Sequence, residues 1–226
     1  MTSAPGNHPA DLSLIERLAG IPYTGAVTDI LDEMGYFHQT LPHAIQSLVP
    51  GQTVAGRALT LRGESTPIDD PDLIYLPVLK MLGEIRPGDV LTNQANDNVS
   101  AHFGELSSET AKFRGARGAV IDGGARDTEY IVRLGFPVFA RYKTPTDIRG
   151  RWRLLEWNVP IVIGSVNITP GDLILGDRDG VVVIPQTIAE EVVSKAEEVV
   201  RTENLVRAAI LKGVLPLEAY QRFGRF

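Results

Sequence analysis

The sequence lacks cysteine altogether. Disulfide bonds, thiolate metal sites and cysteine nucleophiles are therefore excluded together. Long apolar runs are missing as well: no stretch approaches the roughly 20 residues that cross a bilayer, and the polar segment from Met1 to Pro9 has no apolar centre of the signal-peptide type. We therefore expect a soluble cytoplasmic protein with no membrane partner.

Histidine is scarce, and the chain contains only His8, His38, His43 and His102. None of them shows the HxH or HExxH spacing of a zinc hydrolase or a zinc-type aldolase. Asp, Glu and water remain as metal ligands, and they favour Mg²⁺ or Mn²⁺ over zinc. A Schiff-base aldolase is the minor alternative, because only Lys143 is placed where a lysine could be desolvated.

The sequence also has no excess of positive charge and no motif typical of a nucleotide-binding loop. The formal net charge is −6 and the basic residues are scattered among acids, so we expect no nucleic-acid partner. The motifs GxGxxG after a strand, GxxxxGK before Ser or Thr, and GxSxG do not occur, which argues against dinucleotide, P-loop and hydrolase-elbow sites. We expect no organic cofactor.

The length of 226 residues suits one well-buried core, so we expect a single domain. Apolar spacing predicts short helices at 11–18 and 24–34, the second with Thr24 as its N-cap. The middle of the chain then alternates between strand and helix, which predicts a parallel sheet covered by helices. The expected elements there are strand 90–92, helix 107–113, strand 119–121, helix 127–134 and strand 137–142.

The last third of the sequence changes character. Short apolar runs at 159–166, 172–176 and 180–184 are separated by Gly- and Asp-rich turns, which predicts antiparallel or mixed strand pairing. Residues 186–212 carry a broad apolar stripe with charges opposite, which predicts a long amphipathic helix. This helix either covers the domain or packs on a neighbouring subunit.

Most of the chemical information lies in residues 103–127. The segment Gly104–Ser107 precedes the predicted helix, so free N–H groups of the first turn can hold a carboxylate or an enolate oxygen. The simpler interpretation is an ordinary cap, with Ser107 or Ser108 as N-cap and Glu105 favourable to the helix dipole. The segment indicates a site only together with a second motif at the same sheet edge.

That second motif is the loop Asp122–Asp127, which follows an apolar strand and has the sequence Asp-Gly-Gly-Ala-Arg-Asp. An arginine beside an acid at the mouth of a sheet suits a bidentate grip on a carboxylate next to a metal. The two glycines would let backbone approach a ligand. The simpler interpretation is that Asp122 caps the loop, Asp127 caps the helix and Arg126 is solvated.

These motifs resemble the family of ribonuclease E activity regulator A, and the resemblance covers about 11–212. It rests on Gly-Glu-Leu at 104–106, Arg-Gly-x-x-Gly-x-Val-x-Asp-Gly at 114–123 and the Arg126-Asp127 pair, and it extends to PTDIRGRWRL at 145–154. The family includes 4-hydroxy-4-methyl-2-oxoglutarate aldolases that also decarboxylate oxaloacetate. The resemblance therefore implies an α/β fold, a swivelling-type α-β-β-α sandwich with a mixed sheet in a single domain, and lyase activity.

The resemblance also implies roles for individual residues. Asp127 would bind Mg²⁺ or Mn²⁺, and Arg126 would contact the substrate and stabilise the enolate. Glu105, at a place where such aldolases more often carry Asp, would relay protons as base or acid. The pyruvyl carboxylate would be held by the backbone of Gly104, Glu105, Leu106 and Ser107.

The implied reaction is metal-dependent retro-aldol cleavage of a small 2-keto acid such as 4-hydroxy-4-methyl-2-oxoglutarate to pyruvate. Oxaloacetate decarboxylation would use the same site, because both reactions release the same enolate. The alternative is a non-catalytic regulator that binds and inhibits a ribonuclease, as the family's namesake does, although the acid at position 105 favours an enzyme. A quinone methyltransferase is disfavoured, because no methyl-donor loop follows the first strand.

The resemblance further implies a homotrimer or homohexamer with sites at subunit interfaces. A glutamate from a neighbouring subunit's last helix would then orient the metal's waters, and Glu203 is the match in this sequence. The expected organisation is a disordered N-terminus at 1–10, a catalytic domain at 11–212, and a tail at 213–226 that packs on the domain or on a neighbouring subunit.

Overall fold

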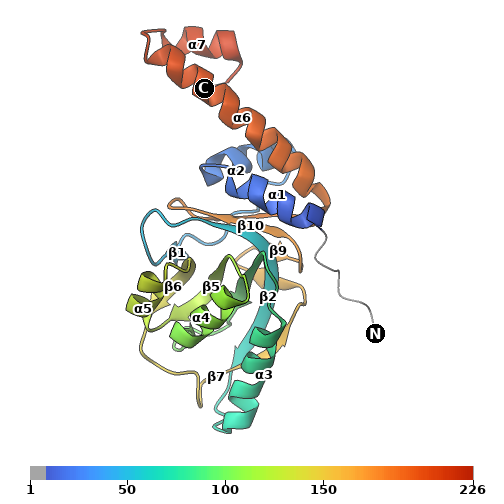
Figure 1. Cartoon of the computed structure of the whole chain (residues 1–226), viewed down its shortest axis with the longest axis vertical. Coiled ribbons are helices and arrows are strands. Elements are labelled where there is room, and N and C mark those ends of the chain that lie inside the picture. Colours follow the sequence, from blue (N-terminus) through green and yellow to red (C-terminus); the bar gives the residue numbers. More distant parts are fainter. Residues whose placement is uncertain (1–8, 226) are drawn as a thin grey trace.

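A curled sheet of mixed strand direction forms the centre of the structure, a computed structural model that describes residues 9–225 (Figure 1). Its principal strand order is β1-β6-β5-β3-β2-β10-β11, with β4 paired to β5 and β7 paired to β2, while β8 and β9 form a separate hairpin. The strands are β1 (Gln46–Ser47), β2 (Val54–Ser65), β3 (Asp89–Gln94), β4 (Ala101–Phe103), β5 (Gly118–Ala125), β6 (Val138–Lys143), β7 (Trp152–Trp157), β8 (Ile161–Ile163), β9 (Val166–Ile168), β10 (Leu173–Gly176) and β11 (Val181–Ile184).

Strand direction divides the sheet as the sequence pattern predicts. The pairs β2–β3, β3–β5 and β5–β6 are parallel, and the pairs β2–β10 and β10–β11 are antiparallel. The helices are α1 (Pro9–Ala19), α2 (Thr24–Glu33), α3 (Pro71–Glu84), α4 (Glu105–Phe113), α5 (Thr128–Leu134), α6 (Ala189–Ile210) and α7 (Pro216–Phe223). The predicted α/β fold with a mixed sheet in one domain is confirmed.

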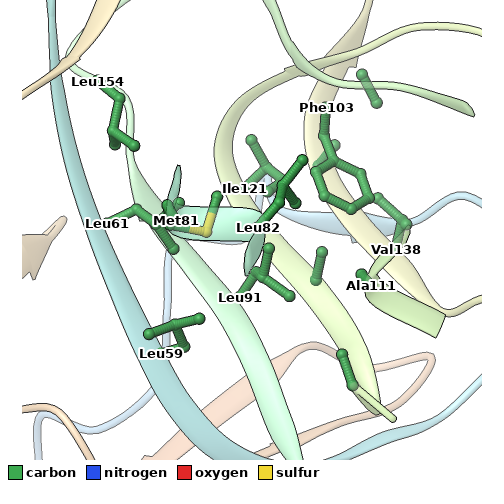
Figure 2. Packing of buried hydrophobic residues seen from close by; sticks show 14 of the residues in the cluster. Leu59, Leu61, Met81, Leu82, Leu91, Phe103, Ala111, Ile121, Val138 and Leu154 are labelled. Carbon is green, nitrogen blue, oxygen red and sulfur yellow. The ribbon is translucent and has the colours of Figure 1, made fainter. Parts of the chain in front are cut away.

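The helices cover the sheet in two separate groups. Apolar residues of α3, α4 and α5 form one buried cluster with the parallel strands, and those of α1, α2 and α6 form another with β10 and β11. In the first cluster, Met81 and Leu82 of α3 pack over Leu61, Leu91 and Ile121 of β2, β3 and β5 (Figure 2). This packing fixes α3 beside α4 and beside the edge where the parallel strands end.

The prediction that Thr24 caps α2 is wrong. Thr24 is the first helical residue, Tyr23 stands at the N-cap without a side-chain cap, and the cap comes from Asp177 between β10 and β11. The Asp177 carboxylate accepts hydrogen bonds from Thr24 N at 2.7 Å and from Thr24 Oγ1 at 3.0 Å. A residue 153 positions away therefore satisfies the helix start, and local sequence carries no signal for that.

The apolar run at 159–166 forms a hairpin rather than one strand. β8 and β9 pair antiparallel and turn at Gly164, whose φ of +62° lies in the left-handed region. The alternate hairpin residues Ile161, Ile163, Val166 and Ile168 are buried against the central strands, so this hairpin contributes to a third cluster of the core.

A bulge in β2 makes room for a large buried side chain. Pairing with β7 shifts between Arg62 and Gly63, and a Cβ at Gly63 would lie 2.1 Å from Cζ2 of Trp152. Trp152 is 2% exposed, and its Nε1 donates to the carbonyl of Ala95 at 2.7 Å. Glycine is required at position 63 because the indole occupies the side-chain space.

The C-terminal helices project from the body of the molecule (Figure 1). α6 leads away from the sheet, and α7 folds back and packs on α6. Arg17 of α1 holds the first half of α6 through Glu197 at 2.9 Å. Tyr23 donates to Glu203, so that glutamate is bound within its own chain. Arg225 pairs with Glu33 of α2 at 2.9 Å, which ties the end of the tail to the domain.

The expected N-terminal segment at 1–10 falls mainly on residues 1–8, which lie outside the described residues. Pro9 and Ala10 belong to α1. None of the helices within residues 9–225 combines the length and apolar character needed to span a membrane.

Candidate active site

The two motifs between 103 and 127 meet at one edge of the sheet. β4 and β5 are parallel and pair Ala101 with Gly124 and Phe103 with Ala125, so the turns that follow them open side by side. Arg126 N donates to the carbonyl of Phe103 at 2.9 Å, which joins the two turns directly. Segments that are separate in sequence therefore form one surface.

Helix α4 begins earlier than the sequence pattern predicts. Gly104 is the N-cap and Glu105 the first helical residue, whereas Ser108 lies inside the helix and donates from N and Oγ to Gly104 O at 3.0 and 2.8 Å. The predicted caps at Ser107 and Ser108 are therefore wrong. The N–H groups of the first turn belong to Glu105, Leu106 and Ser107, and that of Glu105 lies 3.4 Å from Oδ2 of Asp127 in the second turn.

Gly104 is required by a close approach rather than by its backbone conformation. Its φ of −149° is ordinary extended backbone. A Cβ at this position would lie 2.8 Å from Oδ2 of Asp127 and 3.2 Å from Cγ of Arg126. The glycine thus lets the Arg126-Asp127 pair lie against the start of α4.

Asp127 stands at the N-cap of α5 but does not cap it with its side chain. Its backbone is left-handed, with φ 52° and ψ 32°, a conformation that costs a non-glycine residue roughly 1–2 kcal/mol and that Asn and Asp tolerate best. Oδ2 lies 3.4 Å from Glu105 N and 3.5 Å from Arg126 Nε. Asp127 therefore occupies the cap position of the simpler interpretation, but its side chain is not used as the cap, and backbone strain of this kind is typical of functional positions.

Arg126 is held by Asp147, an acid for which the sequence pattern gives no signal. Its Nη1 lies 2.7 Å from Oδ2 of Asp147, in the segment after β6. The other Asp147 oxygen accepts from Arg149 N at 2.8 Å and from the Tyr75 hydroxyl at 3.1 Å. Burial raises the pKa of Asp147, but the hydrogen bonds from Arg149 N and Arg126 outweigh it and hold the pKa below its usual value. Arg126 is therefore oriented by a fixed carboxylate and is not merely solvated.

A cleft of about 380 Å³ lies beside these groups. Glu105 lines both this cleft and a neighbouring pocket between α4 and α5, and among residues 9–225 its carboxylate has no hydrogen-bond or ion-pair partner. The cleft is lined by Tyr75, Val78, Leu79 and Leu82 of α3, by Ala101–Ser107 and Thr110, and by Arg126, Asp127, Asp147 and Ile148. The predicted substrate-, metal- and proton-handling residues of one chain, Gly104, Glu105, Leu106, Ser107, Arg126 and Asp127, thus line one cavity.

Two other candidates lie outside this cleft. Asp122 faces Arg141 at 3.4 Å, and burial raises the pKa of its carboxyl despite that arginine. Lys143 lines a separate, shallow depression on the other side of the Arg126-Asp127 pair, together with Thr128 and Thr144. Lys143 is an exposed residue, so the desolvation that a Schiff-base lysine needs is not provided.

His102 supports the site from beneath. Its side chain is fully buried, its Nε2 lies 3.2 Å from Oδ2 of Asp97, and its Nδ1 accepts from Gly124 N at 3.1 Å. Burial lowers the pKa of His102 to about 4, although Asp97 opposes the shift. With both ring nitrogens engaged, the neutral histidine braces β4 against β5 rather than offering a metal ligand.

This burial predicts that acid destabilises the protein. The unfolded chain takes up a proton on His102 near pH 6.5, whereas the folded chain does so near pH 4, so the stabilisation is complete above pH 6.5 and is lost as the pH falls from 6.5 to 4. We expect the free energy of unfolding to be about 2 kcal/mol lower at pH 5 than at pH 7 from this group. Urea unfolding at pH 5 and pH 7 measures this difference in the free energy of unfolding. His102→Gln should remove most of the difference. An equal difference in the variant would contradict the assignment of the pH effect to His102.

The donor set at the cleft fits a hard divalent cation better than a soft one. Among the described residues no three His, Asp or Glu side chains converge as a closed metal cluster. Mg²⁺ commonly binds through one or two carboxylates and completes its shell with water and substrate oxygens. Asp127, with a carboxylate that is 41% exposed at the cleft, fits that pattern, and Glu105 is the next carboxylate along the same wall.

Comparison with known sequences places residues 24–183 in a family described as RraA-like, Aldolase/RraA. A protein of Halalkalibacterium halodurans named "Putative 4-hydroxy-4-methyl-2-oxoglutarate aldolase" is 34% identical over 212 residues, which covers 93% of this chain and 95% of that protein. The matched regions include both turns of the cleft.

Solved structures with similar folds agree with that assignment. An uncharacterized protein from Pseudomonas syringae pv. tomato is 29% identical, with a TM-score of 0.83 over 99% of this chain and 100% of that one. Streptomyces coelicolor RraAS2, described as an unusual member of the RNase ES inhibitor RraA protein family, is also 29% identical, with a TM-score of 0.78 over 90% of this chain and 99% of that one.

Proposed function

This chain belongs to the RraA-like family, and we propose that it is a divalent-metal-dependent lyase that splits 4-hydroxy-4-methyl-2-oxoglutarate-like 2-keto acids to release pyruvate. Oxaloacetate decarboxylation would proceed in the same site. The observation that carries the proposal is the single cleft faced by the Arg126 guanidinium, the Asp127 carboxylate and the first-turn N–H groups of α4.

The proposed cation is Mg²⁺ or Mn²⁺, held by Asp127 with water and substrate completing its shell. When bound, it would supply Lewis-acid polarisation of the 2-keto group. Asp127 suits this role because its carboxylate is turned out of the capping position and kept at the cleft by Glu105 N and Arg126 Nε. The proposed reaction uses no organic cofactor.

The chain's own residues would bind and orient the substrate. The N–H groups of Glu105, Leu106 and Ser107 would hold the pyruvyl carboxylate at the positive end of α4. Arg126, fixed by Asp147, would face the 2-keto oxygen as it gains negative charge. Glu105, whose carboxylate is unpaired among residues 9–225, would take the C4 hydroxyl proton or return a proton to C3.

The second candidate function is a non-catalytic regulator that binds and inhibits a ribonuclease. The likeness to Streptomyces coelicolor RraAS2 favours it, and so does the net charge of −6, which would suit a mimic of RNA. A regulator of this kind would not require catalysis by Asp127 and Arg126. An assay for metal-dependent catalysis therefore distinguishes the two candidate functions. In either case we expect a cytoplasmic homotrimer or homohexamer.

The direct test is pyruvate release by the purified protein. We expect turnover of 4-hydroxy-4-methyl-2-oxoglutarate and of oxaloacetate with Mg²⁺ or Mn²⁺, and loss of both activities when EDTA removes the metal and their return when metal is restored. Because free metal also decarboxylates oxaloacetate, each assay is read against the same metal without protein. No protein-dependent pyruvate from either compound with any divalent metal would contradict the proposal and leave the regulator.

The close approach at Gly104 gives a second test. Gly104→Ala would push the Asp127 carboxylate away from α4, since the added Cβ would lie 2.8 Å from Oδ2. Displacing a catalytic group by about 1 Å can cost on the order of 100-fold in rate, so we expect kcat/KM to fall roughly 10- to 100-fold with little loss of stability.

Gly83→Ala is the matched control. Nothing lies within 4 Å of its added Cβ, and the residue belongs to α3 but not to the cleft lining. Alanine in a helix should stabilise the protein by up to about 1 kcal/mol and leave kcat/KM unchanged. Unchanged kcat/KM in Gly104→Ala would contradict the claim that the close approach of Gly104 to Asp127 positions that carboxylate for catalysis.

A further inference from the structure

A β-bulge lies directly before the first turn of the cleft. Ala101 and Phe103 of β4 pair with consecutive residues of β5, Gly124 and Ala125, so His102 is the extra residue of the bulge. Bulges are common next to active sites, where they bend the end of a strand and re-aim the side chains that follow it. The turns that begin where β4 and β5 end carry the polar residues of the cleft.

The side chain of His102 binds the backbone of β5 within this bulge. Its Nδ1 accepts from Gly124 N at 3.1 Å. A Cβ at Gly123 would lie 2.4 Å from that Nδ1, and a Cβ at Gly124 would lie 2.4 Å from Cε2 of Tyr142. The two glycines of the loop Asp122–Asp127 therefore let the backbone lie against the rings of His102 and Tyr142, rather than against a ligand as the sequence pattern suggests.

The tautomer of His102 follows from the state of Asp97. The Asp97 carboxylate accepts from the N–H groups of Val99 and Ser100 at 3.2 and 2.7 Å, and from the Ser65 hydroxyl at 3.1 Å. Burial alone would raise the pKa of Asp97, but these hydrogen bonds hold the pKa below its usual value, so the carboxylate is ionised and can only accept. Nε2 of His102, 3.2 Å from Oδ2, must then carry the proton, which leaves Nδ1 as the acceptor of the neutral ring.

The hydrogen bond from Gly124 N leads to the polar groups of the cleft. Two residues further along, Arg126 N donates to the carbonyl of Phe103, the residue after His102. Both bonds run from β5 or its turn to β4, so they fix the chain immediately before Asp127. The ring of His102 is fully buried and can act on the site only through this backbone.

Resting on the proposed function, we infer that His102 and Asp97 are positioning residues for the cation-binding carboxylate of Asp127 and for Arg126. Asp97 keeps the proton on Nε2, so that Nδ1 can hold Gly124 N. The end of β5 then presents the two side chains that follow it to the cleft. The other tautomer would direct the Nδ1 proton at the Gly124 N–H and release the end of the strand. Both residues act through the backbone, and neither is assigned a contact with substrate or metal.

Two substitutions separate the bond to Gly124 from the bond to Asp97. His102→Asn keeps an acceptor oxygen close to the place of Nδ1 but is too short to reach Asp97, whereas His102→Gln reaches Asp97 and leaves Gly124 N without an acceptor. On the scale set by displacing a catalytic group by about 1 Å, we expect kcat/KM for pyruvate release to fall roughly 10- to 100-fold in His102→Gln and less than about 3-fold in His102→Asn. Calorimetric titration should show weaker Mg²⁺ binding in His102→Gln alone.

Thr60→Val is the matched control for lost stability. Thr60 is fully buried in β2, its hydroxyl donates to the carbonyl of Val159 at 2.6 Å, and it does not line the cleft. The variant should unfold at a lower urea concentration than the wild type and keep wild-type kcat/KM and Mg²⁺ affinity. A loss of kcat/KM in His102→Asn equal to or greater than that in His102→Gln, or wild-type kinetics in His102→Gln, would overturn the inference.

The tautomer can be read in the unaltered protein. Nitrogen NMR of protein labelled at its histidines should show, at pH 7, a proton on Nε2 of His102 and none on Nδ1, with the signals assigned by their loss in His102→Asn. A proton on Nδ1 would overturn the inference, whatever the kinetics of the variants.

Pyruvate release by the wild type separates this failure from failure of the proposed function. If the wild type is active with Mg²⁺ or Mn²⁺ and His102→Gln equals it, the proposed function stands and only the inference falls. If the wild type gives no protein-dependent pyruvate, both fall together.

Discussion

Replacing Arg126 by alanine is expected to lower kcat for pyruvate release roughly 100- to 1,000-fold, the usual cost of removing a donor that faces a developing oxyanion. Arg126 is fixed for this task by Asp147 at 2.7 Å on one side and by its backbone bond to Phe103 O on the other. Steady-state kinetics with oxaloacetate and with the best 2-keto acid measure the loss. We expect kcat to fall more than KM rises, because the interaction strengthens as charge develops.

Arg126→Lys should restore little of this activity. A lysine ammonium is a point charge and cannot reproduce the planar fork that contacts Asp147 and the substrate together. Arg133→Ala is the matched control, since Arg133 lies in the neighbouring helix α5, is 68% exposed, and contacts Glu129 and the Tyr130 ring, neither of which lines the cleft. Wild-type kinetics in Arg126→Ala, with the fold confirmed by thermal unfolding, would remove Arg126 from the mechanism.

Asp127→Asn is expected to cause a loss of about 1,000-fold or more and to abolish the response of activity to Mg²⁺. Asparagine has nearly the same shape and tolerates the left-handed backbone at φ 52°, so the variant removes charge with little change in conformation. A neutral amide oxygen is a poor sole protein ligand for a hard divalent cation. Calorimetric titration with Mg²⁺ and the metal dependence of kcat both report the effect.

Glu129→Gln provides the comparison for Asp127→Asn. Glu129 lies two positions further along, its side chain is 76% exposed, and the change removes the same charge outside the cleft. We expect it to bind Mg²⁺ and turn over substrate as the wild type does. Equal Mg²⁺ affinity in wild type and Asp127→Asn would show that the cation, if needed, is held elsewhere.

The alternating middle of the chain could be predicted because its signals are local. Apolar runs at 119–121 and 137–142 mark strands in any parallel sheet, and the parallel order of such strands then brings their following turns to one edge. The meeting of Gly104 with Asp127 follows from that rule. The distance between them does not, because it depends on the register of β4 against β5.

The features that escaped prediction depend on contacts between distant parts of the chain. Asp147 was missed because its partners, Arg126 and Tyr75, lie 21 and 72 positions away. The local pattern points to Thr24 as the cap of α2 for the same reason, since Asp177 reaches the helix from another strand pair. The pattern places the start of α4 too late because Gly104 is a weak cap signal next to two serines.

The contacts of Asp177 with Thr24 and of Glu197 with Arg17 also have a consequence for folding during synthesis. α1 and α2 leave the ribosome before the other described elements, yet Arg17 and Thr24 find their partners 180 and 153 residues later. α1 can contact β2 early, but α6, β10 and β11, which supply much of the buried cluster over both helices, are made only in the last third, and closing such long loops is entropically costly. The parallel half of the sheet can assemble during translation, whereas the cluster that holds the N-terminal helices is completed near its end.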